Sequence, residues 1–192
     1  NADVNGISLG MRDVFIRNGI EFLFTNIHTH HGMYPLYQNQ KPYFWENDNG
    51  EKLLVWSGEH YNLGNALGIV FNKNMNFMTE SYFGKDGAAA AIEALHKNLG
   101  DSIAEYEESG YPYDFYITSV SGVFSDNAPA NPAIIHTVNE FNARYGNEVT
   151  LQMVTLQELY DLIREKVADA PVYRGAMNDW WGNGVGSTPY AV

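Results

Sequence analysis

The sequence predicts an α/β fold in which strands and helices alternate along the chain. Short runs rich in Val, Ile, Phe and Tyr have the composition of buried strands. Several longer segments between them begin with helix-capping residues and end at glycine. Because repeated strand–helix–strand units place their strands in parallel, we expect a parallel sheet with helices on its faces. No internal repeat or linker is visible, so residues 1–192 are expected to form a single domain.

The first third of the chain predicts a helix, a buried strand and a hairpin. Ser8 is a suitable N-cap for the helix, and Asn18-Gly19 ends it. Asn47-Asp48-Asn49-Gly50 is a strong turn signal between two apolar runs. The expected elements are a helix over 9–17, a strand over 20–26, a polar loop over 28–40 and hairpin strands over 43–46 and 52–58.

The rest of the chain predicts three helices that alternate with strands. The first is rich in alanine and is expected to break or kink at Gly100-Asp101. Asn131-Pro132 is typical of a helix start, and Thr155 with Glu158 forms a capping box for the last helix. The expected helices span 86–110, 132–144 and 155–167, and the expected strands span 114–120, 149–154 and 172–173.

The composition narrows the classes of function. The formal net charge of −12 argues against nucleic acid and anionic membranes as partners, because both select basic surfaces. The chain has no cysteine, which excludes disulfides, thiolate nucleophiles and cysteine-bound zinc. No apolar run approaches the roughly 20 residues that span a bilayer. We therefore expect a soluble, cytoplasmic protein that acts on a small molecule. Separately, Asn1-Ala2 is expected to be the remnant of a cleaved tag.

Three polar loops follow predicted strands, where α/β sheets bind their ligands. His28, His30 and His31 suit metal binding, hydrogen bonds to a sugar or general base chemistry, and equally an ordinary loop. Asp126, with Asn127 beside it, suits an acid/base or a hydroxyl-binding carboxylate, although a turn is the commoner role of such residues. The third loop, 177–186, is glycine-rich and carries two adjacent tryptophans.

The tryptophan-rich loop is the most distinctive of the three. Trp180 and Trp181 offer flat apolar faces, and Asp179 offers hydrogen bonds, which together suit a sugar. They also suit a loop that two large side chains hold against a core. Glu46 and Glu59, in the aromatic hairpin region, are a possible glycosidase carboxylate pair, although packing and solvation are the commoner roles of such residues.

Three blocks, taken in order, resemble the catalytic domain of glycoside hydrolase family 38, the alpha-mannosidases and their bacterial relatives. The resemblance covers roughly residues 15–190. The blocks are Pro42-Tyr43-Phe44-Trp45-Glu46 with 50–56, Ser125-Asp126-Asn127-Ala128-Pro129 with the segments to Thr155, and Pro171-Val172-Tyr173-Arg174-Gly175 leading to Asp179-Trp180-Trp181.

The resemblance implies a seven-stranded (β/α) barrel, of the type shared with family 57 hydrolases and polysaccharide deacetylases. It implies a retaining, zinc-assisted hydrolysis of alpha-linked sugars in oligosaccharides or glycosides. Asp126 would be the acid/base or a hydroxyl-binding carboxylate, with Asn127 beside it. The histidines 28, 30 and 31 would line the substrate cleft, and Asp179, Trp180 and Trp181 would form its aromatic wall.

The family's zinc ligands have no counterpart in this chain. The N-terminal His-x-Asp motif, the nucleophile and a later histidine would all lie outside it, so we expect zinc in the full-length parent and none here. The chain would then be the later part of a catalytic domain, inactive alone, with an uncovered sheet edge open to self-association. Two alternatives remain open: a deacetylase-like metal hydrolase using His28 and His30, and a non-catalytic carbohydrate-binding domain using Trp180 and Trp181.

Overall fold

The computed structural model describes residues 2–4, 6–27, 36, 39–59, 61, 63–70, 87–121 and 130–177. The chain divides into two compact units, each described by itself below. The first comprises Asn1–His60 and Val154–Val192, and the second comprises Tyr61–Met153. The expectation of one domain stays a prediction.

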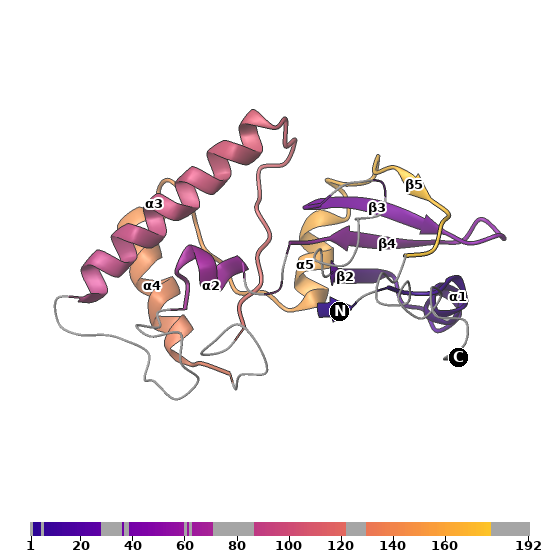
Figure 1. The fold of residues 1–192 in the computed structure, drawn as a ribbon, viewed down its shortest axis with the longest axis horizontal. Coiled ribbons are helices and arrows are strands. Elements are labelled where there is room, and N and C mark those ends of the chain that lie inside the picture. The colour runs from indigo at the N-terminus through magenta and orange to yellow at the C-terminus, as the bar shows by residue number, and fades with distance from the viewer. Residues whose placement is uncertain are drawn as a thin grey trace, which may run out of the picture. The chain divides into compact units, whose positions relative to one another are not determined.

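The first unit is built on a mixed sheet with the strand order β1-β2-β4-β3-β5. Strands β1, β2 and β4 run parallel, β3 runs antiparallel to β4, and β5 runs parallel to β3 (Figure 1). The strands are β1 (Ala2–Val4), β2 (Phe22–Ile27), β3 (Lys41–Glu46), β4 (Lys52–Ser57) and β5 (Val172–Tyr173). The α/β class is thus confirmed, but the sheet is not all parallel, because the short 47–51 connection forces β3 and β4 into a hairpin.

Two helices of the first unit pack on opposite faces of this sheet. Side chains of Tyr43 and Trp45 share one face by strand alternation, and Phe15 of α1 (Leu9–Arg17) packs against their cluster. On the other face, the Phe22 ring stacks on Tyr160 of α5 (Leu156–Ile163) with centroids 5.6 Å apart. Arg12 of α1 and Leu159 and Ile163 of α5 are the buried residues of these two helices.

The capping signals in the sequence correctly located both helix starts. Ser8 Oγ accepts a hydrogen bond from the Met11 backbone N–H at 3.3 Å, and α1 ends at Arg17 as expected. Thr155 and Glu158 form the expected capping box at the start of α5. This last helix ends at Ile163, four residues before its predicted end.

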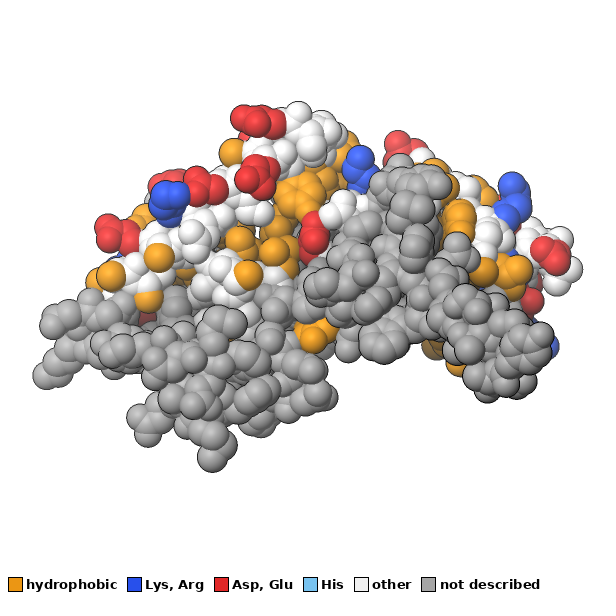
Figure 2. Space-filling view, in the orientation of Figure 1, with side chains coloured by type: hydrophobic (Ala, Val, Ile, Leu, Met, Phe, Trp, Pro, Cys, Tyr) orange, Lys and Arg blue, Asp and Glu red, His pale blue; other side chains and the backbone are white. Residues whose placement is uncertain are grey.

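The second unit packs three helices around an apolar core. They are α2 (Leu63–Leu67), α3 (Gly87–Glu108) and α4 (Ala133–Tyr145). The core residues are Leu67, Ile69, Val70, Ile92, Leu95, Leu99, Ile134 and Phe141. Acidic side chains gather on the exposed side of α3, shown in red in Figure 2.

The predicted break in α3 is wrong. This helix continues through Gly100, because the burial of Leu95, Leu99 and Ile103 offsets the cost of a glycine inside a helix, about 1 kcal/mol.

The two strands predicted in the second unit are not formed. Residues 114–120 and 149–154 belong to no sheet. Asparagine side chains bind backbone groups there: Asn142 donates to Leu151 O and accepts from Leu151 N, both at 2.8 Å. Asn65 bonds both backbone groups of Ser121 in the same way, at 2.9 and 2.8 Å. At each place, a side-chain amide thus makes the backbone hydrogen bonds that a neighbouring strand would otherwise make.

Among the described residues, none of the helices has the length and apolar character needed to cross a membrane.

Candidate functional site at the carboxyl edge of β2 and β4

Strand direction gathers polar residues at one edge of the first unit's sheet. The parallel strand β4 ends at Ser57, beside Thr25 of β2, and β2 itself ends two residues later at Ile27. Because β3 is antiparallel, its first residue Lys41 also pairs with Ser57, and Gln40 therefore lies at this edge. The carboxyl ends of parallel strands are where α/β sheets place ligands. Asn26, from β2, belongs to the same edge.

Hydrogen bonds fasten the segment after β4 to this edge. The backbone N–H of Gly58 donates to Thr25 O at 2.8 Å, and Asn26 Nδ2 donates to Glu59 O at 2.5 Å. Asn39 Nδ2 donates to the Glu59 carboxylate at Oε1. The edge therefore presents a carboxylate whose backbone and side chain are both held in place.

An indole and an amide form a buried pair at the start of β3. Trp56 Nε1 donates to Gln40 Oε1 at 3.1 Å, and neither residue has measurable exposure. Gln40 has a φ of 50°, an uncommon left-handed conformation for a residue with a side chain. The buried bond helps to hold this backbone just before β3 begins.

Three buried hydroxyls lie on the α1 face of the same sheet. Among the described residues of the first unit, Thr25 Oγ1, Tyr43 OH and Ser57 Oγ have no hydrogen-bond partner. Strand alternation and register place all three on one face. Burial, followed by the nearby Tyr173, raises the pKa of Tyr43 well above its ordinary value, so its hydroxyl stays neutral.

The opposite edge of the sheet carries an ionic network around Glu46. Arg174 Nε donates to Glu46 Oε1 at 2.7 Å, and Lys52 Nζ lies 3.6 Å from Glu46 Oε2. The hydrogen bond from Arg174 holds the pKa of the Glu46 carboxyl below its ordinary value. Buried Arg12 donates to the backbone oxygen of Glu46 at 2.7 Å. These contacts assign Glu46 to holding the fold together.

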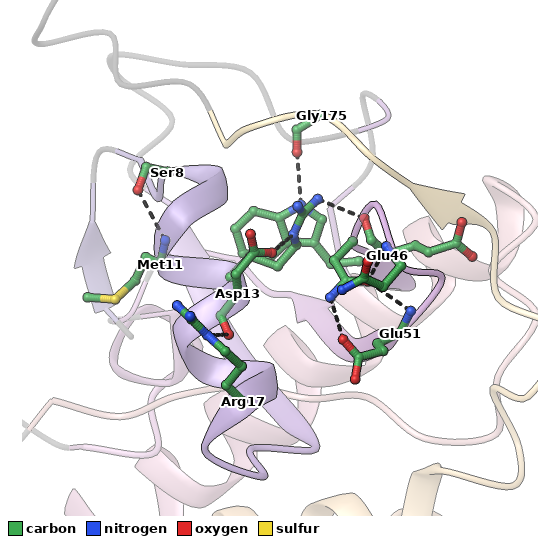
Figure 3. Close-up of polar contacts among 11 residues, drawn as sticks. Ser8, Met11, Asp13, Arg17, Glu46, Glu51 and Gly175 are labelled. Atoms are coloured by element: carbon green, nitrogen blue, oxygen red, sulfur yellow. Dashed lines mark hydrogen bonds and ion pairs between the residues drawn. The ribbon is translucent and has the colours of Figure 1, made fainter.

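The same end of the sheet anchors the segment that precedes the tryptophan-rich loop. Trp45 Nε1 donates to the labelled Gly175 O at 2.8 Å (Figure 3). Tyr173 OH donates to Ala176 O at 2.6 Å. An antiparallel bridge then joins Met177 to Ile7. The chain is therefore fixed up to Met177.

A pocket of about 390 Å³ lies between the α5 face of the sheet and α5 itself. Lys52 and Arg164 line it, each close to an aromatic ring: Phe44 at 5.8 Å and Tyr160 at 5.7 Å. Two acidic residues, Glu21 and Glu165, also line it. Its charges are balanced and both cations already contact rings, so the pocket shows no preference for a charged ligand.

The site residues predicted from the sequence lie outside the described part of the chain. For them the catalytic and binding roles stay predictions. They are His28, His30, His31, Asp126, Asn127, Asp179, Trp180 and Trp181. Among the residues that are described, no group of three or more His, Cys, Asp or Glu side chains could hold a metal ion.

The sequence did not predict that the polar residues at this edge, Thr25, Asn26 and Gln40, lie together; we call them the edge cluster. The sequence predicts Thr25 and Asn26 as the end of an apolar strand and Gln40 as part of a loop. A pair of polar residues that ends an apolar run is the signal that marks such an edge. Gln40 gives no such signal, because it reaches the edge only through the antiparallel pairing of β3 with β4.

Comparison with models of known families, with curated proteins and with solved structures finds no match to this chain.

Proposed function

We propose that the chain is part of the catalytic domain of a glycoside hydrolase similar to the alpha-mannosidases of family 38. The full-length protein would hydrolyse alpha-linked sugars with retention of configuration. In it, the mixed sheet of the first unit would contribute to a seven-stranded (β/α) barrel. The observation that carries the proposal is the gathering of amides, hydroxyls and one carboxylate where β2 and β4 end.

These residue types match the chemistry of a sugar. Amides such as Asn26 and Asn39 both donate and accept hydrogen bonds, while the Glu59 carboxylate accepts them from hydroxyl groups. His28 directly follows β2 in the sequence, at the end of the strand that carries Asn26. A polyhydroxylated ligand would meet several such groups together.

The chemistry of a retaining glycosidase needs two carboxyl groups. One attacks the anomeric carbon, while the other protonates the leaving oxygen and later deprotonates the water that releases the sugar. In this chain we assign the second role, or the binding of a sugar hydroxyl, to Asp126. The nucleophile would come from another part of the full-length protein.

Zinc would be held elsewhere in the full-length protein. The described residues of this chain offer no ligand cluster that fits it, so no step is assigned to zinc here. The chain's own contribution is to bind and orient the sugar and to move a proton at its leaving oxygen.

Hydrolysis of p-nitrophenyl alpha-D-mannopyranoside by the full-length protein tests the proposal. We expect nitrophenol release that chelation of zinc abolishes, and proton NMR should show the alpha anomer as the first product. A first product with the beta anomer would contradict the retaining mechanism. Acetate release from acetylated chitooligosaccharides would favour a deacetylase instead. Quenching of tryptophan fluorescence by sugars without turnover would favour a binding domain.

A further inference from the structure

The pocket between the sheet and α5 has a floor of apolar side chains. Phe44 of β3 and Leu54 of β4 are paired in the sheet and so share its α5 face, and Tyr160 comes from α5. Leu54 is buried, while Phe44 and Tyr160 are half-buried. The volume of about 390 Å³ falls in the range of about 300–1,000 Å³ that small-molecule sites occupy. The floor can therefore receive the apolar part of a small ligand.

Four charged side chains line the same pocket, two of each sign. Glu21 precedes β2 and Lys52 begins β4, while Arg164 and Glu165 follow α5. All four residues are exposed. The pocket therefore lies at the amino ends of β2 and β4, whereas the edge cluster lies at the carboxyl ends of the same sheet.

These opposite charges do not pair with one another. Among the described residues, neither Glu21 nor Glu165 has an ion pair or a hydrogen bond through its side chain. Lys52 Nζ lies 3.6 Å from Glu46 Oε2, and Arg164 Nη1 lies 3.9 Å from Asp161 Oδ1. Both distances exceed that of a hydrogen bond. An ammonium has three N–H donors and a guanidinium has five, so both cations keep donors for a ligand.

We propose that this pocket binds a zwitterion, namely an α-amino acid with a large apolar side chain. Lys52 and Arg164 donate hydrogen bonds to its carboxylate, and Glu21 or Glu165 accepts them from its ammonium group. Its side chain lies on the apolar floor. An ion of one sign is attracted by two of the four charges and repelled by the other two, whereas a zwitterion gains from both pairs. The inference goes beyond the proposed function and does not depend on it.

The first test compares three ligands on the full-length protein by saturation-transfer NMR. L-phenylalanine should bind with a Kd on the order of 1 mM, because ion pairs at exposed groups contribute little each. 3-Phenylpropionate lacks the ammonium group and 2-phenylethylamine lacks the carboxylate. Each should bind on the order of 10-fold more weakly, because one pair of charges in the pocket is then left without its partner.

The second test removes the charges of the pocket one sign at a time. The double variants Lys52→Met/Arg164→Met and Glu21→Gln/Glu165→Gln should each weaken binding of L-phenylalanine on the order of 10-fold. All four residues are exposed, so the fold is expected to persist, which circular dichroism checks. Arg17→Met and Glu51→Gln are the matched controls: both residues are exposed charges of the first unit outside the pocket, and the Kd should be unchanged.

The outcomes are distinguishable. No binding of L-phenylalanine up to about 10 mM would overturn the inference, and so would equal binding of the three ligands. Equal affinities of the pocket variants and the controls would also overturn it, since the amino acid would then bind elsewhere. If a double variant does not fold, the three ligands and the other variant decide. Glycoside hydrolysis is measured separately, and its absence would overturn the proposed function while leaving this inference standing.

Discussion

Arg12 Nη1 donates a hydrogen bond to the backbone carbonyl of Glu46 at 2.7 Å, across 34 positions of the sequence. The guanidinium is only 2 % exposed and lies 5.9 Å from the centre of the Trp45 ring. It therefore joins α1 to the end of β3 at a site closed to water. Because water cannot replace the hydrogen-bond partners of this buried guanidinium, substitution of Arg12 is expected to lower stability.

Replacing Arg12 should destabilise the first unit. Arg12→Met leaves the carbonyl of Glu46 without its donor, and we expect the free energy of unfolding to fall by about 2–3 kcal/mol. The matched control is Arg17→Ala on the same helix, where the exposed guanidinium binds only Asp13 O and the loss should stay below about 0.5 kcal/mol. Urea unfolding followed by tryptophan fluorescence isolates this unit, because all four tryptophans belong to it. Equal losses for the two variants would contradict the anchoring role of Arg12.

Two glycines of the second unit should respond in opposite directions to alanine. A Cβ at Gly64 would come within 2.6 Å of Val120 Cγ1 and 2.7 Å of Ser119 O, so Gly64→Ala should destabilise by about 1–3 kcal/mol. Gly100 lies in α3 with no atom within 4 Å of its added Cβ, so Gly100→Ala should stabilise by about 0.5–1 kcal/mol. Unfolding followed by helical circular dichroism measures both. A stabilising Gly64→Ala would mean that α2 and the Ser119 segment are not closely packed.

Asn142 should contribute more to the free energy of unfolding than its partly exposed position suggests. Asn142→Ala removes both hydrogen bonds to Leu151, and we expect a loss of about 1–3 kcal/mol in the second unit. Gln152→Ala, an exposed neighbour of Leu151, serves as the control and should change stability by less than about 0.5 kcal/mol. If Asn142→Ala is as stable as wild type, the amide does not substitute for a strand partner.

The contact between Asn142 and Leu151 shows which features of the fold the sequence predicts and which it does not. Features set by neighbours in the chain were predicted correctly: the Ser8 cap, the hairpin around Asn49-Gly50 and the Thr155 capping box. Residues 149–154 have the composition of a strand, but their partner is a side chain nine residues away, which propensity cannot reveal. The place of Gln40 in the edge cluster is also invisible to local patterns, because Gln40 meets Trp56 only through strand pairing.

The ion pair of Glu46 should make the first unit more stable at neutral pH than in acid. The pKa of Glu46 is lowered in the folded state, so its contribution is present above the unfolded value of about 4.3 and is lost as the pH falls through the folded pKa. The difference in unfolding free energy between wild type and Glu46→Gln should therefore favour wild type at pH 7 and shrink below about pH 4. A difference independent of pH from 7 to 3 would contradict the ion pair with Arg174.

The most direct test of the account is the turnover of Asp126→Ala in the full-length protein. If Asp126 supplies the acid/base or grips a sugar hydroxyl, kcat/KM for p-nitrophenyl alpha-D-mannopyranoside should fall by at least about 100-fold. Thermal unfolding of the variant, measured alongside, separates lost chemistry from lost fold. Near-normal turnover by a folded Asp126→Ala variant would contradict the assignment and remove this chain from the reacting part of the active site.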